Sequence, residues 1–431
     1  MTPTSELEVW LGGRRAGHLL EEAPGMWSFV YTMAQPDGGP PVSLALPRSA
    51  GVHKGERVAA VFGGLLPDGS LRDRLARSLG LSHGNDFALL ARIARECPGA
   101  LSLRVPGALR RHSIPVRRLD AEEVRHTVAA LTVHPLLAEV DGLAKTLPGE
   151  FDKLPVRVDD DVVSIVLDDT LSTHVLKPAR PGLREAVANE AWCMALAEAW
   201  GLPVTGTRLL LGPAGVLLSS RCDRRRGGGG EIEAIHMEDC CQALGRHPAR
   251  PYEREGGPRL AEIAALLRRV GAQPGIDLRA LVRWTIFGFL VGCGTLHGRQ
   301  LGVLLESTGV RLAPFFGLWS THVYPEMSLR MGLRIGLEDR PDWLGAERWR
   351  ELAVELGVRP AWLLDELGEA ARTLPRLARD VADDFHRRYG FFEIVRSIRG
   401  LIDQRARQTL VSLASAGESP TARAARPPTS A

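Results

Sequence analysis

The sequence has little of several features that would assign a protein at once. Its 431 residues include 54 basic and 51 acidic side chains, so the formal net charge is only +3. This balance excludes, on composition alone, a polybasic protein that binds nucleic acid or a membrane surface. With His counted as neutral, the longest uncharged run is residues 284–298, which has 15 residues, whereas a transmembrane helix needs roughly 20. We therefore expect no membrane partner and no direct nucleic-acid binding.

Cysteine is also scarce, and its spacing carries no metal signature. The six cysteines contain no C-x2-C pair of the kind that binds zinc. A chain of this length with 45% hydrophobic residues can build two or three domain-sized cores without disulfides. We expect no metal site from these residues, and a cytoplasmic location for the protein.

Lysine is the rarest of the charged residues. Only four of the 54 basic residues are lysine, namely Lys54, Lys145, Lys153 and Lys177. If each basic position were filled at that ratio, lysine would occur at both 153 and 177 with a chance of roughly half a percent. We therefore predict that these two positions need a compact ammonium group.

The chain divides by pattern into a small mixed part and a connecting segment. Within residues 1–105, short β-rich runs at 7–11, 27–31 and 42–46 precede helical periodicity at 70–78 and 86–95. Residues 106–145 form the connecting segment, with one helix expected at 121–131. We expect the first part to be a small N-terminal subdomain of strands and helices.

The remainder predicts two lobes and a tail. Residues 146–245 hold strands at 155–158, 162–166 and 173–176 and a helix at 184–200, whereas residues 246–415 are mostly helical. Two helices, 360–373 and 376–388, are expected on either side of Pro375. Arg221 and Arg224 are read as part of a solvated turn, with contact to an acidic partner as the other reading, and residues 416–431 as a disordered tail.

A kinase-like order of chemical groups follows the second boundary. Gly149 lies in a turn before a strand, Lys177 ends a later strand, and Glu190 lies on the next helix. A carboxylate on that helix could orient the ammonium group toward nucleotide phosphates. The fold class expected is therefore α+β, with the architecture of a protein kinase.

Several strings resemble the HipA family, the kinase-fold toxins of bacterial toxin–antitoxin modules. They run in order over nearly the whole chain: FGGLLPDG at 62–69, CPGAL at 97–101, LPG at 147–149, THVLKP at 173–178, NE at 189–190, HMEDCCQALG at 236–245 and LAP at 312–314. The resemblance implies a HipA-type fold with a β-rich lobe, a helical C-terminal lobe and ATP-dependent serine/threonine kinase ancestry. It assigns nucleotide contacts to Gly149, Lys153, Lys177, Glu190, Glu238, Asp239 and Cys240.

The chain departs from the family pattern where the chemistry takes place. The catalytic loop of the family reads Gly-Asn-x-Asp-x-His-x-Lys-Asn, and here residues 292–300 read GCGTLHGRQ. Thr295 therefore replaces the general base, Gln300 replaces a metal-binding Asn, and Gly317 replaces a metal-binding Asp. His297 keeps its position, and Arg299 replaces a Lys. A positioned base is typically worth ~10² to 10⁴ in rate, and Gly317 offers no oxygen ligand to Mg²⁺.

The phosphate loop departs as well, because Glu150 and Phe151 stand where the family has Ala-Gln. We expect ATP binding, if it occurs, to be weak and independent of Mg²⁺. The leading reading is a HipA-like pseudokinase that acts by binding or regulation, with a small helix-turn-helix antitoxin or an active HipA-like kinase as its partner. The alternatives are an active kinase toxin that phosphorylates a translation factor such as glutamyl-tRNA synthetase, and a functionless copy.

Overall fold

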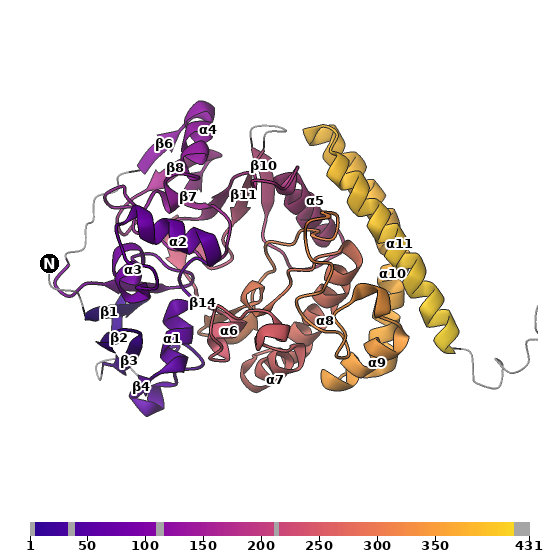
Figure 1. Ribbon diagram of the computed structural model, residues 1–431, viewed down its shortest axis with the longest axis horizontal. Coiled ribbons are helices and arrows are strands. Elements are labelled where there is room, and N and C mark those ends of the chain that lie inside the picture. The colour runs from indigo at the N-terminus through magenta and orange to yellow at the C-terminus, as the bar shows by residue number, and fades with distance from the viewer. Residues whose placement is uncertain (1–4, 33–38, 109–115, 211–214, 418–431) are drawn as a thin grey trace, which may run out of the picture.

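The structure, a computed structural model, describes residues 5–32, 39–108, 116–210 and 215–417. It is an α+β fold whose N-terminal subdomain lies at the left of Figure 1, with a sheet-rich lobe above and a helical lobe to the right. None of the helices formed by these residues is long and apolar enough to cross a membrane. All six cysteines are free thiols.

The N-terminal subdomain is built on a five-stranded antiparallel sheet. The sheet has the order β4-β3-β2-β1-β5, formed by Glu6–Leu11 (β1), Arg14–Ala23 (β2), Met26–Tyr31 (β3), Val52–Lys54 (β4) and Leu101–Arg104 (β5). Apolar residues of the sheet share one core with three helices, Glu56–Gly63 (α1), Gly69–Ser78 (α2) and Asp86–Ile93 (α3). In β1 every second residue is buried, which is the pattern of a strand with one face on a core.

The expected strand at 42–46 is wrong. This segment forms only an isolated bridge between Ser43 and Leu46. Its polar groups are used elsewhere, because the Ser43 hydroxyl and the Leu44 amide both donate to the carboxylate of Glu238. The alternation of apolar residues at 42–46 predicted a strand, but the contact of Ser43 with Glu238, almost 200 residues later in the sequence, holds the segment in another conformation.

A six-stranded antiparallel sheet forms the second layer. Its order is β10-β11-β9-β7-β8-β6, formed by Val116–Leu119 (β6), Leu154–Asp159 (β7), Val162–Val166 (β8), His174–Lys177 (β9), Thr207–Leu210 (β10) and Val216–Ser220 (β11). Helix α4 (Ala121–Ala130) follows β6, and helix α5 (Ala186–Ala199) connects β9 to β10. The segment expected to be a connection therefore contributes an edge strand to this sheet.

A short hairpin and a three-stranded sheet join this layer to the helices. The hairpin consists of Arg224–Arg226 (β12) and Ile232–Ala234 (β13), and the sheet consists of His236–Asp239 (β14), Gly302–Glu306 (β15) and Gly309–Leu312 (β16). The helical lobe contains Cys240–Ala243 (α6), Leu260–Val270 (α7), Pro274–Val291 (α8), Ala346–Glu355 (α9), Pro360–Tyr389 (α10) and Glu393–Gly417 (α11). The long helices α10 and α11 pack along the right edge of the molecule (Figure 1).

Helix α10 is continuous through Pro375, so the expectation of two separate helices is wrong. A proline inside a helix removes one backbone hydrogen bond and costs ~3 kcal/mol. Buried residues continue on both sides of it, including Ala371, Leu374 and Ala378. Apolar packing of this face offsets the local penalty. Helix α11 includes Ala416 and Gly417, and the rest of the expected tail, 418–431, lies outside the described residues.

A buried charge network fastens the N-terminal subdomain to the sheet-rich lobe. Glu96, three residues after the end of α3, accepts hydrogen bonds from Lys145, Arg221 and Arg224. Both arginines also pair with Asp223, and all five side chains are at most 4% exposed. The solvated turn expected at Arg221 and Arg224 is therefore wrong, since these guanidinium groups are buried between two parts of the protein. Burial raises the pKa of Asp223, but the two arginines outweigh it and lower the value to about 2.

Candidate nucleotide cleft and transfer centre

Lys177 and Glu190 lie together as the kinase-like order predicts. Lys177 ends β9, and its Nζ lies 2.5 Å from Glu190 Oε1 on α5. Glu190 is buried, and although burial raises its pKa, Lys177 and Arg180 lower it overall, so the carboxylate is ionised. Asn189 holds this helix in place, because its side chain exchanges hydrogen bonds with the backbone of Ser320.

Arg180 contacts the same carboxylate and was not anticipated. Its guanidinium pairs with the second oxygen of Glu190, and its carbon Cζ lies 4.4 Å from the ring centre of Phe151 and 4.1 Å from that of Trp319. Arg180 thus contacts an aromatic residue of the phosphate loop and another that follows Gly317, and the two rings meet edge to face. Cation–π contacts of this kind contribute ~0.5–2 kcal/mol each.

The phosphate loop itself is bonded to the chain around it. Gly149 has φ +109°, which only glycine adopts without strain. Its amide donates to Asp68 Oδ2 at 3.0 Å, and its carbonyl accepts from the Asp68 amide. Lys153 donates from Nζ to the carbonyl of Pro148 at 2.5 Å. Burial lowers the pKa of Lys153 to about 7; Lys177 and Arg299 add to the shift, and Asp68 opposes it.

Arg299 connects the catalytic loop to the N-terminal subdomain. Its side chain is 3% exposed, pairs with Asp68 and lies 3.4 Å from Asp239 Oδ2. It also donates to the carbonyl of Gly64 at 2.7 Å. Two residues of the FGGLLPDG string, Gly64 and Asp68, therefore bind this buried guanidinium.

The three residues assigned to the adenine-binding segment lie on β14 and at the start of α6. The Glu238 carboxylate accepts from Ser43 and Leu44, and burial raises its pKa to about 8. Asp239 caps α6 by accepting from the Gln242 amide. The Cys240 amide donates to the carbonyl of Leu301 at 2.8 Å. The side chains of Glu238 and Asp239 are therefore engaged in packing the subdomain and the loop together.

At the transfer centre, Thr295 and Gln300 still carry side-chain oxygen atoms, but these belong to a hydroxyl and an amide and carry no negative charge. The Thr295 hydroxyl is buried beside Cys293. Gln300 Oε1 is buried and accepts no hydrogen bond from the residues that the structure describes. Gly317 has φ +66°, and no heavy atom lies within 4 Å of the position a Cβ would take. Space for a side chain therefore exists at 317, and an aspartate tolerates this backbone conformation better than most residues.

Two histidines near Thr295 do not replace the missing base. The His297 ring packs edge-on against Tyr252, and burial, with Arg299, lowers its pKa to about 3. His322 lies against Gly294, but its Nδ1 accepts from Arg405 at 2.6 Å. Arginine can only donate, so the other nitrogen of a neutral His322 carries the proton and has no lone pair to accept one from a substrate.

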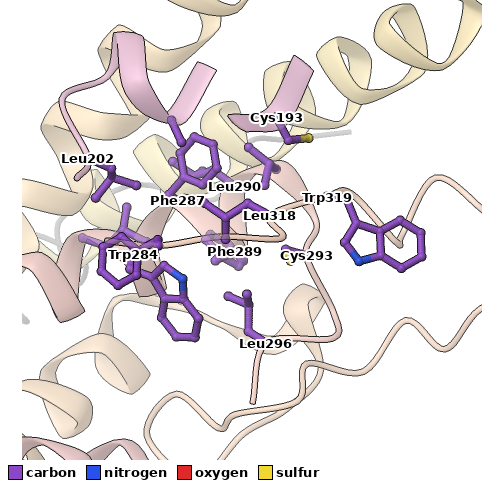
Figure 2. Close-up of a cluster of buried hydrophobic side chains, with 14 of the residues drawn as sticks. Cys193, Leu202, Trp284, Phe287, Phe289, Leu290, Cys293, Leu296, Leu318 and Trp319 are labelled. Atoms are coloured by element: carbon purple, nitrogen blue, oxygen red, sulfur yellow. The ribbon is translucent and has the colours of Figure 1, made fainter. Parts of the chain in front are cut away.

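The packing beneath this loop is ordinary hydrophobic core. Figure 2 shows Leu290 of α8 with Cys293 and Leu296 of the catalytic loop and Leu318 of the following segment. Trp319 lies at the edge of this cluster, where its ring reaches Phe151 and Arg180. The catalytic loop therefore rests on a well-packed core, although its side chains at 295, 299 and 300 differ from those of the family pattern.

Two family descriptions match the chain. The HipA N-terminal domain matches residues 7–104, and the HipA-like C-terminal domain matches residues 146–386, which is more than half of the chain. The chain belongs to the HipA family. The same assignment follows from the protein named "Putative kinase Y4mE" of Sinorhizobium fredii, which is 35% identical over 393 residues, 88% of this chain and 93% of that protein.

A further HipA relative and a solved HipA structure support the fold. The serine/threonine-protein kinase toxin HipA of Shewanella oneidensis is 27% identical, over 88% of this chain and 89% of that protein. The structure of a Shewanella oneidensis HipA, solved with HipB and operator DNA, has a TM-score of 0.81, 23% identity and coverage of 98% and 100% of the two chains. The fold is thus the protein-kinase-like HipA fold.

Within this HipA-family chain, the structure brings Gly149, Lys153, Lys177 and Glu190 close together: Lys153 bonds to the carbonyl before Gly149, Lys177 pairs with Glu190, and the charge of Lys177 lowers the pKa of Lys153. Sequence reasoning missed Asp68, Arg180 and Trp319. The string LLPDG contained a signal for Asp68, because it resembles the family, but its contacts with residues 149 and 299 could not be read from it. Arg180 and Trp319 have no local signature.

Proposed function

We propose that this HipA-family protein is a pseudokinase that acts by binding within a toxin–antitoxin-related module. The observation that carries the proposal is Arg180, which pairs with Glu190 and lies over the rings of both Phe151 and Trp319. A guanidinium in this position competes with nucleotide phosphates for the space beside Lys177. It also shares the carboxylate that would orient that lysine.

The residues of the transfer centre support the same proposal. Mg²⁺ would need oxygen ligands from positions 300 and 317, and these supply one amide and no side chain. The hydroxyl of Thr295 does not accept a proton at neutral pH as a carboxylate does. These residues do not fit a conventional Mg-ATP site, so no transfer step is derived through one. ATP, where it binds, is expected to bind weakly through Lys177 and without Mg²⁺.

The partner we propose is a small helix-turn-helix antitoxin, or an active HipA-like kinase. The Shewanella oneidensis HipA was solved with HipB and operator DNA, and this shared fold supports a protein partner of the same kind for this chain. We place the protein in the cytoplasm, in keeping with six free thiols. Co-purification with the product of a neighbouring short reading frame would support this partner, and failure to co-purify would count against it.

The second candidate is an active kinase toxin acting on a translation factor such as glutamyl-tRNA synthetase. The intact Lys177–Glu190 pair, at 2.5 Å, is the observation that favours it. Radiolabelled ATP with Mg²⁺ or Mn²⁺ decides between the two, with an active HipA-family kinase assayed in parallel. We expect no label on this protein or on a synthetase above a no-enzyme control. Labelling that Lys177→Ala abolishes would overturn the pseudokinase proposal.

A further inference from the structure

Asp68 occupies the N-cap position of α2 without capping the helix. Its backbone is extended, at φ −109° and ψ 161°, as an N-cap requires, yet its side chain makes no cap hydrogen bond. An aspartate at this position normally accepts from the second or third amide of the helix, a contact worth ~1 kcal/mol. The Asp68 carboxylate is therefore free of the helix amides that an N-cap normally binds, and its partners lie elsewhere in the protein.

The partners of this carboxylate are the groups that kinase-like folds offer to phosphate. One oxygen accepts from the Gly149 amide at 3.0 Å, and the other pairs with the Arg299 guanidinium. Lys153 also lies near Asp68, whose negative charge acts to raise the pKa of that lysine. A backbone amide on a glycine turn, a guanidinium and an ammonium group together form a typical donor set for a phosphate oxygen.

These donors come from parts of the chain that meet only in the folded protein. Gly149 and Lys153 belong to the loop before β7, Arg299 belongs to the catalytic loop, and the anion comes from the N-terminal subdomain. The Asp68 side chain remains 22% exposed. An anion from solution can therefore approach the same donors, provided that the carboxylate is displaced.

We propose that Asp68 is an internal ligand of the phosphate loop: its carboxylate fills an anion subsite that would otherwise take a phosphate group of a nucleotide or polyphosphate. The inference rests on the proposed function in one respect, namely that residues 149–153 form a phosphate loop. It adds that the subsite still has an amide donor, on Gly149, and a cation, Arg299. The Asp68 carboxylate covers both.

Competition sets the size of the effect. A ligand that binds only when Asp68 has moved has an apparent affinity reduced by the fraction of molecules in which the subsite is open. Removing the carboxylate charge should raise that fraction. We expect Asp68→Asn to bind inorganic tripolyphosphate at least ~10-fold more tightly than the unaltered chain.

The test is calorimetric titration of the full chain with tripolyphosphate, in the presence of a chelator. Asp73→Asn is the matched control, because Asp73 lies on α2 itself, is 48% exposed, pairs with His83 instead of the phosphate loop, and its loss changes the net charge equally. Asp68→Glu keeps the negative charge and is expected to bind no better than the unaltered chain. A general loss of packing would affect Asp68→Asn and Asp68→Glu alike.

Asp68→Ser, a residue that can cap α2, serves if Asp68→Asn does not fold. Equal tripolyphosphate affinity in the unaltered chain and a folded Asp68 variant, or no binding by either, would overturn the inference. An equal gain in Asp73→Asn would overturn it as well. The proposed function fails by a different result, phosphate transfer by the unaltered chain, so the two failures are distinguishable.

Discussion

Arg299 on the catalytic loop pairs with Asp68, 231 positions earlier in the sequence. The pair joins the helical lobe to the N-terminal subdomain, and its arginine is almost completely buried. Because Asp68 also accepts from Gly149, one carboxylate holds the phosphate loop and the catalytic loop at a fixed separation. The N-terminal subdomain thus braces both lobes of the kinase fold.

The first prediction concerns this brace. Arg299→Met should lower the free energy of unfolding by about 3 kcal/mol, because it leaves Asp68 and Asp239 without their buried cation. Urea unfolding followed by circular dichroism measures the change. Arg246→Met, which removes the exposed partner of Glu262, should cost less than ~1 kcal/mol. Equal losses in the two variants would show that the brace contributes nothing special.

The second prediction concerns the aromatic residues around Arg180. Phe151→Gln removes one of the two aromatic contacts of Arg180 and restores the residue type that the family has in its phosphate loop. The variant should give a larger rise in melting temperature with ATP than the unaltered chain, with or without Mg²⁺. Phe391→Gln, at a phenylalanine that is 65% exposed, should leave the response to ATP unchanged. If Phe151→Gln shows the same rise in melting temperature with ATP as the unaltered chain, the contact between Phe151 and Arg180 does not limit nucleotide binding.

The third prediction tests the transfer centre. Thr295→Asp, Gln300→Asn and Gly317→Asp together should return a base and two metal ligands, and position 317 has room for the new side chain. We expect this triple variant to remain silent in autophosphorylation, because positioning of the triphosphate supplies much of phosphoryl-transfer catalysis. Activity should require Glu150→Ala and Phe151→Gln in addition. Label on the triple variant alone would show that the phosphate loop is not the obstacle.

The fourth prediction is a pH dependence at Glu238. Burial raises the pKa of this carboxyl to about 8 in the folded protein from an ordinary value near 4.5, so folding favours its protonated form. Its contribution to stability is fully present below pH 4.5 and is lost as the pH rises toward 8. Glu238→Gln should therefore lose less stability than the unaltered chain between pH 5 and 8. Parallel stability curves, measured by urea unfolding at each pH, would contradict this assignment.

The sequence by itself determined the family, the α+β class and the order of the chemical groups. The Lys177–Glu190 pair could be predicted because a strand end and the next helix are close in sequence, and the kinase-like order places them face to face. The losses at Thr295, Gln300 and Gly317 are also legible in the sequence, since they are changes of residue type at positions that local strings identify. The domain boundaries at 105, 145, 245 and 415 stay predictions.

Only the tertiary structure decided what the remaining charged and aromatic residues do. Asp68 meets Arg299, and Arg180 meets Phe151 and Trp319, across separations that no local periodicity encodes. The segment 42–46 and the arginines at 221 and 224 were misread for the same reason, because their hydrogen-bond partners lie in other subdomains. A side chain's environment depends on burial and on distant partners, and these exist only once the subdomains have packed together.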